Sequence, residues 1–141
     1  MIVQTSCTVF AQNLLKGLEN FNTGTPYTYK IALYNANANL SNTTTAYASV
    51  NEVVGAGYTA GGKVLTPTPI STDTSNNIGY VSFNNPVWTP ASFTTRGALV
   101  YNSTTGAACF VLNFGSDKIC SGSFTVTFPV ATSSTAILRI T

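Results

Sequence analysis

Residues 97–114 read GALVYNSTTGAACFVLNF, and this stretch decides the fold. Two largely apolar runs, 97–102 and 107–114, flank a short polar segment that contains Gly106. Two such runs joined by three to five residues with a glycine are typical of a β-hairpin. The second run also alternates between two faces, as a strand does. We therefore expect an antiparallel hairpin at the centre of the fold.

The same alternating pattern continues on both sides of the hairpin. After it, GSFTVTFPV (122–130) directs Phe124, Val126 and Phe128 to one face, and AILRIT (136–141) closes the chain as a terminal strand. About eight short strands separated by turns favour an all-β fold, an antiparallel β-sandwich of jelly-roll or Ig-like type. The strands expected before the hairpin lie at 27–35, 47–54, 63–66 and 78–84.

One helix is expected near the N-terminus. Phe10, Leu14, Leu18 and Phe21 follow one another at spacings of four, four and three residues, which places them in one apolar stripe. Thr5 and Ser6 are candidate N-caps, and Gly24 follows the run. We predict a helix from about residue 7 to residue 19. Its stripe packs either on the chain's own sheet or on a neighbouring subunit.

Length and cysteine content indicate a single domain spanning 1–141, with strands from about 27 to 141. A chain of 141 residues can bury a core without disulfides or a metal. Cys7, Cys109 and Cys120 show no metal-ligand spacing and are expected to be buried thiols, with a Cys109–Cys120 bridge left open. The apolar runs are too short for a membrane span, and the first residues lack the features of a signal peptide.

Charge is scarce in this chain. Only 7% of the residues are charged, and six basic and four acidic residues are scattered to a net charge of +2. This pattern offers no basic footprint for nucleic acid and no cluster for a membrane surface. A surface of neutral hydroxyls and amides suits packing against other subunits, because no charge has to be desolvated there. We therefore expect an assembly, and a homo-oligomer in particular.

The commonest general base and transition-metal ligand, histidine, is missing. The sequence contains no histidine, which excludes Ser–His–Asp and Cys–His arrangements within one chain. The four acidic residues lie in different expected elements, and GAGYTAGGK (55–63) lacks the spacing of a phosphate-binding loop. We predict no catalytic, cofactor-binding or metal-binding residues, no cofactor and no enzyme. The four acidic residues are Glu19, Glu52, Asp73 and Asp117.

Two charged residues near the hairpin form a candidate structural clamp. LNFGSDK (112–118) places Asp117 and Lys118 directly after an apolar run, and Arg96 precedes the first arm of the hairpin. The register expected from the turn does not pair Arg96 with Asp117, but a loop after Phe114 that folds back would bring them together. A bidentate arginine–carboxylate pair at such a corner fixes a loop. We expect Arg96 and Asp117 to be structural.

Aromatic residues leave a sugar-binding role open. Their rings could stack on sugars beside asparagine hydrogen-bonding partners, although aromatic residues in strands usually fill a core. The candidates are Tyr27, Tyr29, Tyr34, Tyr47, Tyr58, Tyr80, Tyr101 and Trp88.

Several long segments resemble a family of small virion structural proteins of tailed bacteriophages. They are YKIALYNANANLSNTTTAY, NEVVGAGYTAGGKVLT, PVWTPASFTTRGALVYN and VLNFGSDK, and the similarity runs in order from about residue 8, including FAQNLLKGLENF. The prolines of TPTPI (66–70) and the cysteines depart from the family pattern. The resemblance implies a head decoration or tail accessory subunit without known catalytic residues. It also implies synthesis in the host cytoplasm and incorporation into the virion.

We therefore expect a capsid decoration (cement) protein that binds the major capsid protein or other virion subunits and stabilises the shell. The alternatives are a collar, tail or fibre-base component, and a glycan- or receptor-binding module on the virion surface. The N-terminal segment and the loops 35–46 and 55–62 are the expected contact regions. The candidate interface residues are Phe10, Leu14, Asn39 and Tyr58.

Overall fold

The structure is a computed structural model that describes residues 1–24 and 26–141. The described part of the chain contains one helix and eight strands. In chain order these are β1 (Thr5–Ser6), α1 (Thr8–Leu15), β2 (Tyr29–Tyr34), β3 (Lys63–Leu65), β4 (Ser71–Asp73), β5 (Ile78–Val81), β6 (Val87–Asn102), β7 (Ala108–Thr125) and β8 (Leu138–Ile140).

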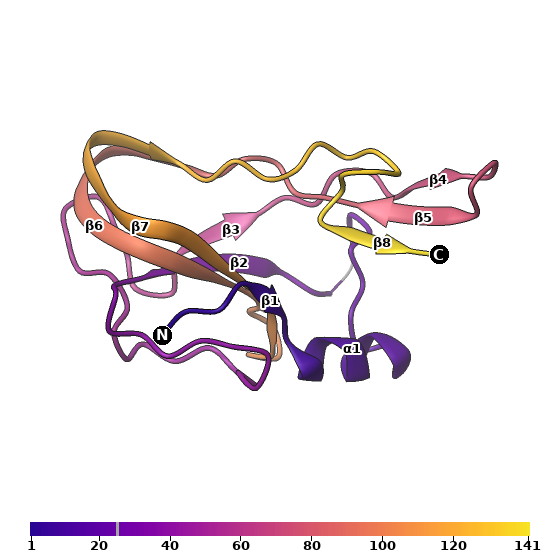
Figure 1. Ribbon diagram of the computed structural model, residues 1–141, viewed down its shortest axis with the longest axis horizontal. Coiled ribbons are helices and arrows are strands. Elements are labelled where there is room, and N and C mark those ends of the chain that lie inside the picture. Colours follow the sequence, from indigo (N-terminus) through magenta and orange to yellow (C-terminus); the bar gives the residue numbers. More distant parts are fainter. Residues whose placement is uncertain (25) are drawn as a thin grey trace.

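The strands form two antiparallel sheets, and the prediction of an all-β sandwich with one N-terminal helix is confirmed (Figure 1). The larger sheet has the order β1-β7-β6-β2-β3, and the smaller has the order β4-β5-β8. Figure 1 shows the smaller sheet extending from one end of the molecule, with α1 beneath it.

The β6–β7 hairpin is the centre of the larger sheet, as its sequence predicts. The turn closes where the Asn102 amide donates to the Ala107 carbonyl at 2.9 Å and the Gly106 amide donates to the Asn102 carbonyl at 2.7 Å. Gly106 has φ of 82°, a conformation that glycine adopts without steric cost. Both arms are much longer than the sequence pattern indicates, at 16 residues for β6 and 18 for β7.

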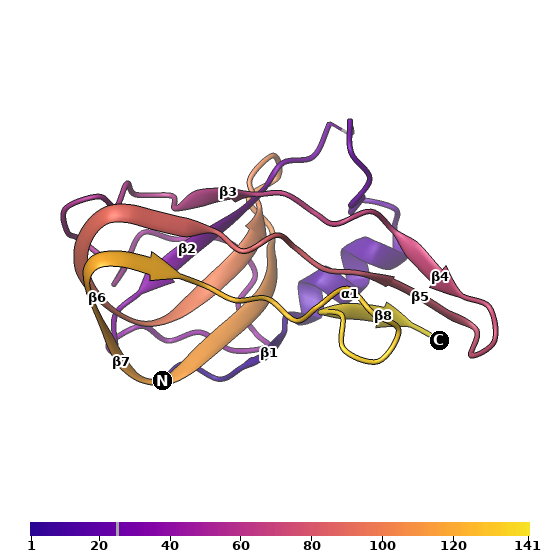
Figure 2. The same cartoon turned by 90° about the horizontal axis from the view of Figure 1, so that it is seen from above.

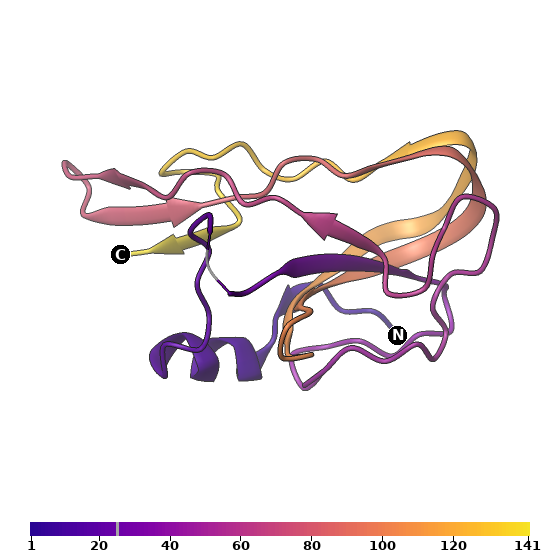
Figure 3. The same ribbon diagram turned by 180° about the vertical axis from the view of Figure 1, so that it is seen from behind.

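The long β6–β7 ribbon bends over and forms part of both layers. The pairing shifts between Thr95↔Lys118 and Gly97↔Asn113, so that one residue of β6 lies opposite four residues of β7. The pairing shifts again between Ala91↔Gly122 and Trp88↔Phe124. Bulges of this kind bend strands and let one strand pass from one layer to the other. Figure 1 and Figure 3 show the resulting arch at one end of the molecule.

Aromatic side chains fill the space between the layers. Phe10 of α1 packs on Phe110 of β7 with ring centroids 4.7 Å apart, and Phe21 stacks on Tyr29 at 4.6 Å. In the bend, Phe93 lies 5.6 Å from Phe124 in an edge-to-face contact. The buried hydrophobic residues form a single connected cluster from Ile2 to Phe128.

The helix is shorter than expected. It spans Thr8–Leu15 rather than about 7–19, because Gly17 adopts a positive φ of 71° immediately after the helical turn ends. Its N-cap is Cys7, since the expected caps Thr5 and Ser6 pair instead with β7 as strand β1.

The strand expected at 47–54 does not form. Within this segment Glu52 makes an isolated bridge with Tyr34, and Asn51 has a positive φ of 62° that interrupts an extended strand. In 122–130 the expected alternation is confirmed for Val126 and Phe128, which are buried, but regular pairing ends at Thr125.

Candidate binding surface

Arg96 and Asp117 do approach each other, but not as the expected clamp. Arg96 is the residue of β6 opposite the bulge in β7, and LNFGSDK continues β7 instead of turning into a loop. The Arg96 Nη1 atom lies 3.4 Å from Asp117 Oδ1, and the two side chains are 36% and 54% exposed, respectively. A single long contact between exposed charges contributes only about 0–1 kcal/mol. The structure therefore shows one contact between these two residues where a bidentate pair was expected, and the segment that follows Leu112 is a strand where a loop was expected.

The four candidate interface residues fall into two groups. Phe10 is 3% exposed in the chain's own core, which leaves it little surface for a partner, whereas Tyr58 is half-buried. The Tyr58 hydroxyl accepts from the Leu33 amide at 2.8 Å, which ties its loop to β2. Leu14 is partly buried against the core, and Asn39 is exposed.

The glycines of loop 55–62 serve close packing within the chain. A Cβ atom on Gly62 would collide with the Ile31 carbonyl, and one on Gly57 would collide with the Pro90 carbonyl. Both residues also have positive φ, at 78° and 77°. The close backbone approach that these glycines allow occurs between the loop and β2 and β6.

A buried carboxylate holds this loop in place. Glu52 is 6% exposed, and its Oε1 accepts from the Tyr58 hydroxyl and the Gly61 amide, each at 2.7 Å. Its Oε2 accepts from the Tyr47 hydroxyl at 2.6 Å. Tyr101 stacks on Tyr47 and donates to the Gly61 carbonyl at 2.6 Å. These contacts, the Glu52 cluster, are missed by sequence patterns because the tyrosines are spread from 47 to 101.

The electrostatic effect of the Glu52 cluster is seen in its tyrosines. Burial, followed by the hydrogen bond to Glu52, raises the pKa of Tyr58 and Tyr47 well above the ordinary value. Both hydroxyls therefore remain protonated donors at neutral pH, which is the form that the carboxylate requires.

A second buried carboxylate lies beside the hairpin turn. Glu19 is 7% exposed, and its Oε2 accepts from the Tyr29 hydroxyl at 2.7 Å and from Asn102 Nδ2 at 3.1 Å. Its Oε1 has no hydrogen-bond partner among the described residues. The Asn20 amide donates to the Tyr29 hydroxyl at 3.0 Å, so this cluster joins the segment after α1 to the sheet.

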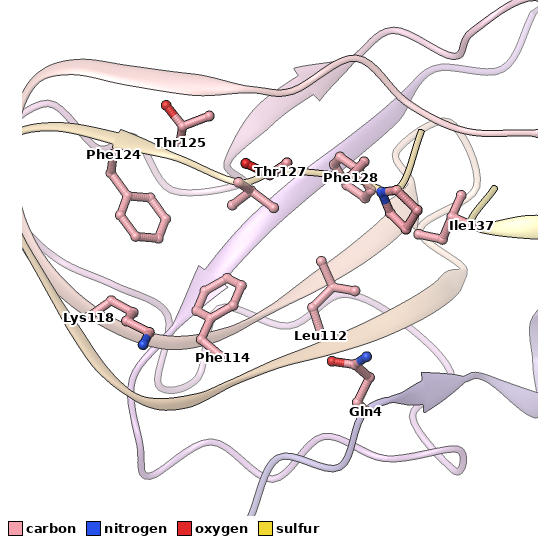
Figure 4. A pocket seen from close by; sticks show the side chains of 11 residues that line it. Gln4, Leu112, Phe114, Lys118, Phe124, Thr125, Thr127, Phe128 and Ile137 are labelled. Atoms are coloured by element: carbon pink, nitrogen blue, oxygen red, sulfur yellow. The ribbon is translucent and has the colours of Figure 1, made fainter. Parts of the chain in front are cut away.

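An apolar hollow opens at the side of the sandwich, between residues 112–118 of β7 and the segment 124–129. Its volume is about 490 Å³. Figure 4 shows the rings of Phe114 and Phe124 pointing into it, with the Lys118 ammonium at one end. Leu112 and Ile137 also line it. Because β1 is only two residues long, no strand of the described chain covers this side beyond Val111.

The thiols lie in the core as predicted. Cys7, Cys109 and Cys120 are all buried and free, so the Cys109–Cys120 bridge that the sequence leaves open does not form. Burial raises the pKa of the Cys7 thiol to about 11 and also raises that of Cys109. A buried thiol of high pKa is a poor nucleophile at neutral pH. Among residues 1–24 and 26–141, no three acidic or cysteine side chains are grouped as metal ligands.

Comparison with known protein families, curated proteins and solved structures finds no match to this chain. Across the described residues, the helical segment falls short of the length and apolar content needed to cross a bilayer.

Proposed function

We propose that this chain is a non-enzymatic structural subunit of a tailed-bacteriophage virion, made in the host cytoplasm. Its leading role is capsid decoration, in contact with the major capsid protein. The observation that carries the proposal is the surface, which combines very few charges with many exposed apolar side chains. Exposed apolar groups on a neutral surface favour burial against other subunits. The most exposed are Met1, Leu15, Val50, Val54, Ile119 and Val130.

These exposed residues revise the expected contact regions. Leu15 is 91% exposed at the end of α1, whereas the neighbouring Phe10 is buried. Val54 is 95% exposed beside the loop that the Glu52 cluster fixes. A rigid loop that presents an apolar side chain binds with little loss of conformational entropy. Leu15, Val54 and the exposed Asn39 are therefore the proposed points of contact with the shell.

The mechanism proposed for stabilisation is the addition of buried surface across the joints between capsid subunits. Each apolar side chain covered at such a joint contributes about 25 cal/mol per Å² removed from water. Many copies on one shell add these contributions, so expansion or internal pressure has to break more contacts. Both the fold and the neutral surface are compatible with this passive role.

An add-back experiment tests the proposal. Shells assembled without this chain are mixed with the purified protein, and bound protein and shell melting temperature are measured. Saturable binding in many copies with a raised melting temperature supports decoration. Leu15→Asp and Val54→Asp are expected to weaken binding while leaving the fold intact, and Ile70→Asp serves as a control at another exposed apolar residue. Absence of binding to shells would contradict the decoration role.

Copy number separates the alternatives within the virion. A collar, tail or fibre-base component is present in a dozen copies or fewer, whereas a decoration protein is present in hundreds. The glycan-binding alternative drew on eight aromatic residues, and among them Trp88 is only 3% exposed and lies under the Lys63 ammonium at 5.6 Å. Burial of Trp88 counts against sugar stacking on this ring, and Trp88→Ala is expected to disturb the core.

A further inference from the structure

β7 is an edge strand over much of its length. On its outer side β1 pairs only with Phe110 and Val111, and the Asn113 side chain donates to the Ile2 carbonyl at 2.9 Å. From residue 118 to residue 125, β7 pairs with β6 on one side, and residues 115–117 belong to the bulge. No other described strand pairs with residues 115–125 on the opposite side. Figure 2 shows this part of β7 at the margin of the molecule, in the arch of the ribbon. Open edges of this kind are templates for pairing with another strand.

The register identifies which backbone groups face outward. The Ser92 amide of β6 donates to the Ala56 carbonyl at 2.9 Å, so it points away from β7. Ser92 lies opposite Ser121, and this pair is therefore a non-hydrogen-bonded pair of the antiparallel ladder. Because pairs alternate along the ladder, Ser121 and Ile119 direct their amides and carbonyls to the open edge.

The protection against pairing that Asp117, Lys118 and the two bulges give this edge does not extend to Ile119. Cys120 points inward and is 3% exposed, while Ile119 points outward and is 80% exposed. Edge strands are normally blocked by a charge at such a position. Here the bulge glycines, Gly115 and Gly122, limit the open segment to residues 116–121 rather than closing it.

We propose that residues 116–121 of β7 pair antiparallel with the same residues of a second copy of this chain. The twofold axis passes through Ile119, so that each Ile119 lies opposite Ile119 of the second copy and each Asp117 lies opposite Ser121. An axis at Asp117 or Lys118 would place two like charges directly opposite each other, which is destabilising. An axis at Ile119 avoids this and brings the two exposed isoleucine side chains together.

The bend of the ribbon agrees with this axis. Ile119 lies between the register shift next to Lys118 and the register shift next to Gly122. A twofold axis perpendicular to the sheet at this point makes the two arches curve in the same direction, which lets the sheet continue from one copy to the next. The contact is small compared with the roughly 1,200–2,000 Å² of stable interfaces. The pair is therefore weak in dilute solution and forms when copies are concentrated.

Cysteine cross-linking of the purified chain tests this inference. In a hydrogen-bonded antiparallel pair the Cα atoms are about 5.5 Å apart, which lies within the range that a disulfide spans. Ile119→Cys is expected to form a disulfide-linked dimer under mild oxidation at least tenfold faster than Val54→Cys, a control of similar exposure outside the edge. The native thiols are buried and do not compete.

The register has its own test. Asp117→Cys and Ser121→Cys are expected to cross-link slowly when each is oxidised alone and rapidly when the two variants are mixed. Two results overturn the proposal: Ile119→Cys dimerising no faster than Val54→Cys, or Ser121→Cys alone matching the rate of Ile119→Cys. The experiment uses only this chain, so its outcome does not depend on the proposed virion role.

Discussion

Replacing Glu52 with alanine is predicted to destabilise the protein strongly. Glu52 is 6% exposed and accepts three hydrogen bonds, from the hydroxyls of Tyr47 and Tyr58 and from the Gly61 amide. Each buried donor left without an acceptor costs about 1–3 kcal/mol. Because the two tyrosines are half-buried and water can partly replace the carboxylate, we expect a loss of about 3–5 kcal/mol in unfolding free energy. This is a large share of the stability of a typical domain.

Two further variants make this prediction specific. Glu52→Gln keeps an acceptor oxygen for two of the three donors, so a smaller loss of about 1 kcal/mol is expected. Asp73→Ala removes an acidic residue whose hydrogen bonds to Asn76 lie on the surface, and little change is expected.

Urea unfolding followed by fluorescence measures all three variants. Trp88 is the only tryptophan and is 3% exposed, and its ring centroid lies 6.3 Å from that of Tyr58, so its emission reports on this region. Linear extrapolation of the transition gives the unfolding free energy. If Glu52→Ala loses less than about 1 kcal/mol, or no more than Glu52→Gln, the Glu52 cluster does not hold the loop as argued.

Three further predictions concern the bulge, the loop and the thiols. Asp117→Ala should lower the unfolding free energy by less than about 1 kcal/mol, because its ion pair with Arg96 is exposed. A larger loss in the same urea assay would support the structural clamp that the sequence predicts. Gly62→Ala should lower the unfolding free energy by more than about 2 kcal/mol, because Gly62 has a positive φ and an added Cβ would collide with the Ile31 carbonyl. The control is Gly79→Ala, whose added Cβ meets open space, and equal melting temperatures of the two variants would contradict this reasoning. At pH 8 the native thiols should resist a disulfide exchange reagent, because all three are buried and burial raises the pKa of Cys7 to about 11. All three thiols should react in denaturant. Rapid labelling of the folded protein would contradict the burial of these thiols.

The sequence predicts those parts of the fold that depend on local patterns. The hairpin follows from two apolar runs around Gly106, and the burial of Val126 and Phe128 follows from strict alternation. The apolar stripe leaves two surfaces open for Phe10, and the structure places it on the chain's own sheet instead of at the expected interface. Its continuation to Leu18 is misleading, because Gly17 ends the helical turn with a positive φ.

The features that the sequence misses depend on contacts between distant residues. LNFGSDK reads as the end of a strand, since Gly115 and two charges follow an apolar run, yet pairing with β6 carries the strand through the bulge to Thr125. In the sequence, Glu52 is one of four acidic residues that lie in different expected elements. Its burial depends on Tyr47, Tyr58 and the Gly61 amide, which meet only after loop 55–62 folds onto the sheet.

Cryo-electron microscopy of the intact particle tests the central claim, that this chain is a decoration subunit of a virion, most directly. We predict density for this sandwich on the outer shell in hundreds of copies, with its arched β6–β7 ribbon recognisable and Leu15 or Val54 against the major capsid protein. Particles purified to homogeneity that contain none of this chain would contradict the claim. Density confined to a dozen copies or fewer at the portal or tail would contradict decoration and favour the collar or tail role.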